Sequence, residues 1–104
     1  MFKSIRLSIL FGKASGLALK GRYPEAKKAI DKCFELGMEE EEILGHAIKG
    51  EIEYQLGNLS EAEKSLKNVL KDTEENPSDW TSSHEKQILD RVNYFWGKLL
   101  NEKT

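Results

Sequence analysis

Apolar residues recur every three to four positions along most of this chain, and charged residues fill the positions between them. This spacing places the apolar side chains on one face of an α-helix, whereas a strand would show a period of two. The pattern predicts five helices, at about residues 4–20, 24–36, 40–56, 60–72 and 80–101. The predicted fold class is therefore all-α, with residues 1–104 forming a single domain.

A short segment of the chain occurs twice. The segments 21–26 and 57–62 lie 36 residues apart, and each has a glycine, a bulky apolar residue two positions later and then a Glu-Ala pair. The glycine supplies the positive φ with which many helices end, and the Glu-Ala pair opens the next helix. A repeat of this length predicts two helical hairpins stacked side by side.

Serine and glutamate residues mark two further helix starts. Ser60 with Glu63, and Ser82 with Glu85, have the spacing of a capping box. The polar segment between them, at about 72–79, contains Pro77 and is predicted to be the one clear loop of the chain.

The repeated segment resembles the tetratricopeptide repeat, a helical hairpin of about 34 residues. The matching positions are turn glycines, small residues at the helix crossing and large apolar residues on the packing faces. They are Leu10, Ala14, Leu17, Gly21, Tyr23, Ala26, Ile30 and Cys33 in repeat one (about 7–40), and Gly50, Gly57, Leu59, Ala62, Leu66 and Val69 in repeat two (about 43–74). The resemblance implies a right-handed array of two hairpins plus a C-terminal helix. In this array Ala14 would meet Ala26, and Gly50 would meet Ala62.

Several positions depart from the family pattern. His46 stands where a large apolar residue is usual, Lys13 and Lys49 stand where leucine is common, and Glu53 stands at the tyrosine site. A plain helical bundle with accidental self-similarity is the alternative that these departures leave open.

The resemblance also implies a binding groove, because the first helices of such hairpins line a concave surface. The positions of this sequence that match the groove are Phe11, Ser15, Leu19, Leu44, Ala47, Glu51, Tyr54 and Gln55, together with Ser8 and Ala18. The lysine, arginine and asparagine with which some members hold a partner's terminal carboxylate are missing from this set. We therefore expect a groove that binds an apolar helix or peptide of a protein partner. The alternative is that the fifth helix of the same chain fills it.

The fifth predicted helix carries two apolar lines, although packing on one neighbour requires only one. The first line is Ile88, Val92, Phe95 and Leu99, and the second is Leu89, Trp96 and Leu100. Exposed apolar clusters around a tryptophan typically mark interfaces. The second line therefore predicts a homodimer, or cover from the N-terminal region.

Composition narrows the function further. Sixteen basic and eighteen acidic residues give a net charge of −2, which disfavours binding to nucleic acid. The chain has no apolar run of the roughly 18 residues that a membrane span needs. We expect a cytoplasmic protein that binds neither nucleic acid nor membrane and needs no cofactor.

Candidate catalytic groups are few. Cys33 lies on a packing stripe, where cysteine behaves as a small apolar residue. His46 and His84 fall on different predicted helices without the spacing of a metal pair. We expect no catalytic or metal-binding residue, and hence a protein that is not an enzyme. A small helical hydrolase or metal protein using the two histidines and the acidic residues is the alternative.

Overall fold

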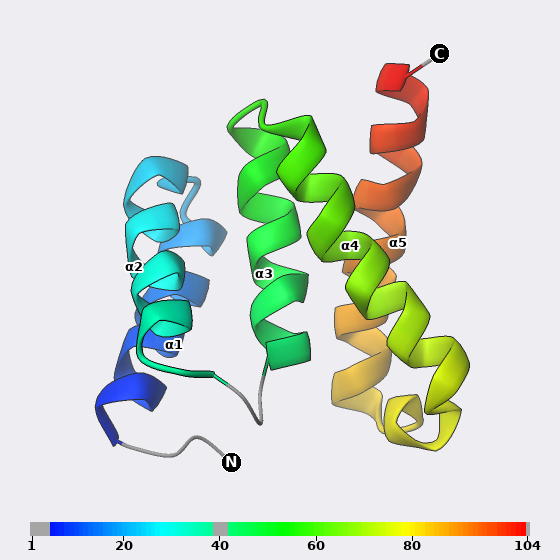
Figure 1. Cartoon of the computed structure of the whole chain (residues 1–104), viewed down its shortest axis with the longest axis horizontal. Helices are drawn as coiled ribbons and strands as arrows, with labels where there is room; N and C mark the ends of the chain where they lie inside the picture. The colour runs from blue at the N-terminus through cyan, green and yellow to red at the C-terminus, as the bar shows by residue number, and fades with distance from the viewer. Residues whose placement is uncertain (1–4, 39–41, 104) are drawn as a thin grey trace.

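The computed structural model describes residues 5–38 and 42–103, which form five α-helices and one short 3₁₀ helix (Figure 1). The elements are α1 (Ile5–Leu19), α2 (Tyr23–Glu35), α3 (Glu42–Gln55), α4 (Leu59–Glu75), η1 (Pro77–Trp80) and α5 (Ser83–Lys103). The predicted all-α class is confirmed, and every predicted helix is present with its described ends displaced by at most three residues. The expected starts of the first and third helices, at about residues 4 and 40, lie outside the described residues.

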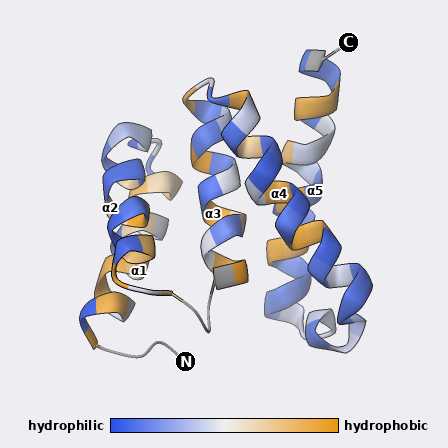
Figure 2. Cartoon of the chain, in the orientation of Figure 1, coloured by the Kyte–Doolittle hydropathy of each residue, from blue (hydrophilic) through white to orange (hydrophobic). Residues whose placement is uncertain are grey.

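The helices pack as two hairpins with a fifth helix behind the second. α1 pairs with α2, α3 pairs with α4, and α3 also touches α1, α2 and α5. In Figure 1, α2 and α4 lie towards the viewer, while α1 and α5 lie behind them. The outer sides of α2 and α4 are mostly hydrophilic (Figure 2). α3 is therefore the central helix of the molecule.

Both hairpins turn in the same way. At the first turn, the N–H of Gly21 donates to the Ala18 carbonyl, and the N–H of the next residue donates to the Leu17 carbonyl. The same two bonds recur 36 residues later, from Gly57 to Tyr54 and from Asn58 to Glu53. This is the Schellman pattern, which needs the positive φ found at Gly21 (77°) and Gly57 (84°). The repeat seen in the sequence is thus a repeat of turn geometry.

Small residues let the helices of each hairpin approach closely. Ala14, Ala26 and Ala62 are fully buried. A Cβ placed on Gly50 would lie 2.5 Å from Cδ2 of Leu66, which is too close for two non-bonded carbon atoms. The nearest atoms that Gly50 faces on α4 belong to Leu66.

Two apolar clusters form the core, and α3 contributes to both. The N-terminal cluster is made by α1, α2 and Ile52 of α3, together with Met38. The C-terminal cluster is made by Ala47 of α3 with residues of α4, η1 and α5. Because its two faces belong to different clusters, α3 links the halves of the domain.

The two predicted capping boxes have different outcomes. Ser82 and Glu85 exchange hydrogen bonds of 3.2 Å between side chain and backbone N–H, so the box at the start of α5 is confirmed. These bonds lower the pKa of Glu85. The box at Ser60 is wrong, because α4 begins at Leu59 and its N-cap residue is Asn58. The Asn58 side chain is used elsewhere, as a donor to Glu53.

The segment predicted as a loop is more ordered than expected. α4 continues to Glu75, and η1 follows directly. Trp80 at the end of η1 is buried in the C-terminal cluster, and its indole N–H donates to Asp72 over 2.9 Å. The burial of Trp80 explains the order, because an indole brought into the core fixes the chain on both sides of it.

Candidate functional site

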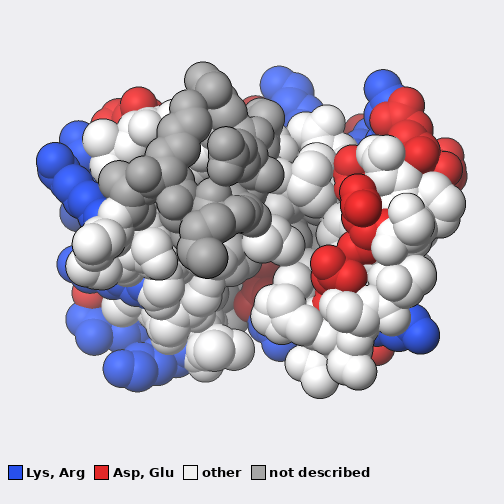
Figure 3. Space-filling view, turned by 90° about the horizontal axis from the view of Figure 1, so that it is seen from below, with Lys and Arg blue, Asp and Glu red and all other residues white. Residues whose placement is uncertain are grey.

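A pocket of about 180 Å³ lies between α1 and α5, with α3 as its floor. In the view from below, the surface is hollowed between the N-terminal hairpin and the C-terminal part of the molecule (Figure 3). The lining residues are Ser15, Ala18 and Leu19 from α1, Ala47, Ile48 and Glu51 from α3, and Ile88 and Arg91 from α5. We call this the α1–α5 groove. No Cα atoms of α1 and α5 lie within 8 Å of each other, so the two walls are separate.

Short side chains make room for the groove. Ser15, Ala18 and Ala47 occupy positions where a leucine would fill the space. The Ser15 hydroxyl donates to the Phe11 carbonyl of its own helix over 3.1 Å, so it needs no partner from the groove. Leu19 stands at the rim with 74% of its surface exposed. The groove is therefore an apolar surface open to solvent.

An ion pair bounds one side of the groove. The Arg91 guanidinium donates from Nε and from a terminal nitrogen to the Glu51 carboxylate, with distances between 2.6 and 2.9 Å. Glu51 is 7% exposed, whereas the Arg91 side chain is about half exposed. A fork of this kind fixes the orientation of both groups. It joins α5 to α3 beside the groove.

The structure brings together only part of the predicted groove set. Ser15, Leu19, Ala47 and Glu51 line the α1–α5 groove, as does Ala18. Of the others, Phe11 packs on the N-terminal cluster, Leu44 is half-buried outside the pocket lining, and Ser8 is exposed. Gln55 lines an adjoining hollow with Tyr23, Glu51, Asp90, Arg91, Tyr94 and Phe95.

α5 covers the end of the predicted groove at Tyr54. The rings of Tyr54 and Phe95 lie 5.6 Å apart, and the Tyr54 hydroxyl donates to Glu102 over 3.1 Å. Loss of water contact and this hydrogen bond raise the pKa of Tyr54. The fifth helix therefore occupies one part of the concave surface and leaves the part at Ser15 and Ala47 open.

Sequence reasoning missed three lining residues, Ile48, Ile88 and Arg91. Ile88 belongs to the apolar line that was expected to be buried, and Arg91 belongs to neither line. The sequence gives only one reason to place Arg91 at the groove. Glu51 needs a cation if it is buried, because a buried carboxylate without one is strongly disfavoured. Forty residues separate the two groups, so no local spacing connects them.

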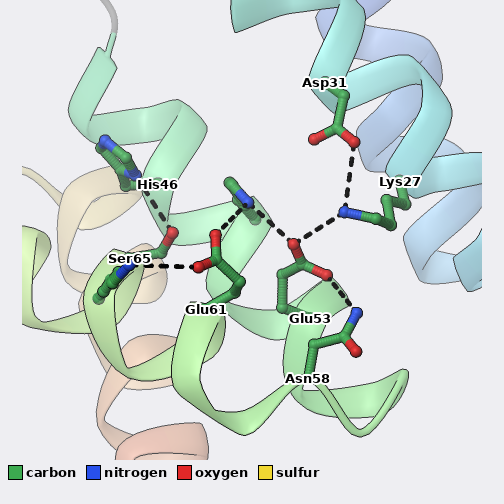
Figure 4. Close-up of polar contacts among 9 residues, drawn as sticks. Lys27, Asp31, His46, Glu53, Asn58, Glu61 and Ser65 are labelled. Atoms are coloured by element: carbon green, nitrogen blue, oxygen red, sulfur yellow. Dashed lines mark hydrogen bonds and ion pairs between the residues drawn. The ribbon is translucent and has the colours of Figure 1, made fainter.

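Two of the residues that depart from the repeat pattern, Lys49 and Glu53, belong to a polar network between α2, α3 and the second turn (Figure 4). Glu53 is 1% exposed and accepts hydrogen bonds from Lys49 (2.8 Å), Lys27 (2.9 Å) and Asn58 (2.9 Å). Lys27 comes from α2 and also pairs with Asp31. Glu53 therefore joins the first hairpin to the second through charged groups.

Hydrogen bonds dominate the ionisation of this network. Burial by itself would raise the pKa of Glu53, but the bonds from Lys49, Asn58 and Lys27 outweigh it and lower the pKa to about 2. The hydrogen bond to Glu53 raises the pKa of Lys27. The carboxylate thus stays charged in the folded protein far below neutral pH.

The groups considered for chemistry lie apart. The His46 Nδ1 is 3.2 Å from the Ser65 hydroxyl, and its ring lies 5.0 Å from that of Phe34. His84 is exposed in the first turn of α5. Cys33 is fully buried, and this burial raises the pKa of its thiol. Among the described residues, no three His, Cys, Asp or Glu side chains are placed to hold a metal ion.

Comparisons with protein-family models, with curated proteins and with solved structures found no match. The resemblance to tetratricopeptide repeats therefore rests on the residues and turn geometry given above. Within the described part of the chain, none of the helices combines the length and apolar character that crossing a bilayer requires.

Proposed function

We propose that this chain is a non-catalytic protein-interaction module that binds an amphipathic helix of a partner in the α1–α5 groove. The observation that carries the proposal is the open apolar pocket between two helices whose Cα atoms all lie more than 8 Å apart. The resemblance to tetratricopeptide repeats supports it, because that family binds partners on the corresponding surface.

The size of the pocket fits one large side chain. Its volume is about 180 Å³, and apolar cavities of about 150 Å³ hold a benzene-sized molecule. A leucine or phenylalanine of the partner would fill it and would cover the exposed Leu19. Burying such a side chain contributes about 1.5 to 3 kcal/mol.

A helix suits this site better than an extended strand. The described residues include no strand, so they offer no sheet edge to which a peptide could add. A groove between two helices accepts an apolar helix face, with anchors spaced three and four residues apart. The Glu51–Arg91 pair beside the pocket would limit how far that helix extends.

A displayed library of amphipathic helical peptides would test the proposal. Peptides selected on the wild-type protein should bind Ser15→Leu at least tenfold more weakly, because the new side chain fills the pocket from its rim. Ser8→Leu is the matched control, since Ser8 is exposed on the same helix outside the pocket. Undiminished binding of the selected peptides to Ser15→Leu would contradict the proposal.

We also propose that the chain self-associates through α5. Leu100 is 47% exposed, and the other members of the second apolar line, Leu89 and Trp96, are half-buried. The second apolar line therefore leaves apolar surface exposed to solvent, most of all at Leu100. Light scattering over a dilution series tests this, and a constant monomer mass would contradict it.

A further inference from the structure

A second hollow continues the α1–α5 groove along α3. It shares Glu51 and Arg91 with the groove. Its other lining residues are Tyr23 at the start of α2, Gln55 of α3, and Asp90, Tyr94 and Phe95 of α5. We call this second part the aromatic hollow. The Glu51–Arg91 pair therefore lies where the groove and the aromatic hollow meet.

Aromatic rings distinguish this hollow from the groove. Three of its lining residues are aromatic, whereas the lining of the groove has no aromatic residue among the described part of the chain. The face of an aromatic ring attracts a cation. One ring of the hollow already does so, because the Lys98 ammonium, which is not part of the lining, lies 5.3 Å from the centre of the Tyr94 ring. The rings therefore favour a cationic side chain in the hollow.

Asp90 gives the hollow a negative charge that nothing neutralises. Its side chain is exposed and forms no ion pair or hydrogen bond with any described residue. Arg91 is the one cation among the described lining residues, and Glu51 neutralises it through a two-pronged contact. The charge that remains in the lining is therefore that of Asp90.

Hydrogen-bonding groups in the hollow are also free for a partner. The side chains of Tyr23 and Gln55 make no hydrogen bond to any described residue. Together with Asp90 they offer a hydroxyl, an amide carbonyl and a carboxylate as acceptors, which suit the several donors of a lysine or arginine. A partner's carboxylate would instead meet the like charge of Asp90. The hollow therefore favours a cation over an anion.

The floor of the surface sets the spacing between an apolar and a cationic anchor. Ala47, Ile48 and Glu51 of α3 line the groove, and Glu51 and Gln55 line the aromatic hollow. Each stretch is about one turn of α3, so the two centres lie about 6 Å apart along the helix. Side chains three or four residues apart on a partner helix have this separation. The ion pair limits the advance of that helix, but a long, flexible cationic side chain can reach past it.

We propose that the partner helix carries a lysine or arginine three or four residues from its apolar anchor, and that this cation binds in the aromatic hollow beside Asp90. The inference rests on the proposed function and specifies the charge of the partner. The anchor in the groove supplies the apolar contact, and the cation fixes the register of the helix along α3.

Selection from a defined peptide library tests both the charge and the spacing. The library displays amphipathic helical peptides with one central leucine, and every amino acid is allowed three and four positions before and after it. Peptides selected on the wild-type protein should carry Lys or Arg at one of these positions. Selection on Asp90→Lys should yield Asp or Glu there instead, because the substitution reverses the charge of the hollow.

Affinities of one selected lysine peptide give the size of the effect. It should bind Asp90→Lys roughly fivefold more weakly than the wild type, and the same peptide with glutamate in place of lysine should show the opposite preference. Added salt should narrow this difference, since the charges are exposed. Glu74→Lys is the matched control, because Glu74 is exposed on α4, lines neither part of the surface and changes the net charge equally. Circular dichroism would verify that both variants are folded.

The outcomes separate this inference from the proposed function. Selected peptides that bind Ser15→Leu as tightly as the wild type would overturn both, because they do not use the groove. Peptides that lose binding to Ser15→Leu but bind Asp90→Lys and the wild type equally would overturn this inference alone. Enrichment of Asp or Glu on the wild type would also overturn it, by showing that Arg91 receives an anion.

Discussion

At the scale of single residues, the most unusual feature is the buried carboxylate of Glu53. It stands where the tetratricopeptide pattern that the sequence resembles has an aromatic ring, and it is kept charged by two lysines and an asparagine. The departures at Lys49 and Glu53 thus compensate each other, because each would be costly in the core alone.

Replacing Glu53 by glutamine should destabilise the protein strongly. The variant keeps the shape but leaves Lys27 and Lys49 facing a neutral amide, and breaking a buried pair costs about 3 to 5 kcal/mol. Urea unfolding at pH 7 measures the loss. Glu61→Gln is the control, because Glu61 is half exposed, lies 3.6 Å from Lys49 and should change stability by less than about 1 kcal/mol. Equal effects of the two substitutions would contradict this account.

The same carboxylate predicts how stability depends on pH. The pKa of Glu53 is about 2 in the folded protein, whereas an unperturbed glutamate has a pKa of 4.5. Folding therefore favours the charged form of this carboxylate. The resulting stability is complete above about pH 4.5 and disappears as pH falls towards 2. It amounts to something on the order of 3 kcal/mol. The stability difference between wild type and Glu53→Gln should therefore shrink from pH 6 to pH 2.5. A constant difference would show that Glu53 is not the group responsible.

At the scale of elements, the packing of the second hairpin depends on a glycine at the contact between its two helices. Gly50 lies against the fully buried side chain of Leu66, whereas nothing lies within 4 Å of the Cβ position of Gly97. Both glycines are helical, so the same substitution has opposite consequences in the two places.

Gly50→Ala should destabilise the second hairpin by about 1 to 3 kcal/mol, because the added methyl group forces α3 and α4 apart. Gly97→Ala should stabilise the protein by about 0.5 to 1 kcal/mol through the better helix propensity of alanine. Thermal and denaturant unfolding of both variants measures whether each substitution raises or lowers the free energy of unfolding. A neutral Gly50→Ala would mean that Leu66 can rearrange and that close approach is not required there.

At the scale of the whole molecule, α5 decides how much of the concave surface stays open. Its backbone lies close to α3 and α4 but not to α1, and its polar contacts with α3 include Arg91 on Glu51 and Glu102 on Tyr54. The α1–α5 groove is the space left beside this attachment.

Arg91→Gln should loosen α5 and widen the groove. Glu51 would be left buried without its cation, at a cost of about 1 to 3 kcal/mol. Hydrogen exchange should quicken in α5 more than in α1 and α2, and this is the measurement to make. Arg22→Gln removes the exposed pair with Glu25 and should change stability by at most about 1 kcal/mol. Uniform exchange across all helices of Arg91→Gln would contradict a local role.

The sequence alone determined the features that depend on near neighbours along the chain. Helix positions follow from apolar spacing, the two Schellman turns from Gly21 and Gly57, and the box at Ser82 from a serine and a glutamate three residues apart. The box at Ser60 shows the limit of such reasoning, because Asn58 holds the N-cap position one residue before the start of α4.

Only the tertiary structure decided the contacts between distant residues. Three such contacts depend on how whole helices pack. They are the Arg91–Glu51 pair, the Lys27–Glu53 pair and the burial of Trp80 in the core. The division of the predicted groove depends on helix packing as well, because α5 covers Tyr54 and leaves Ser15 and Ala47 open. The physical reason is that local spacing fixes which face of a helix is apolar. The partner of that face is chosen by the shapes and charges of all the helices together.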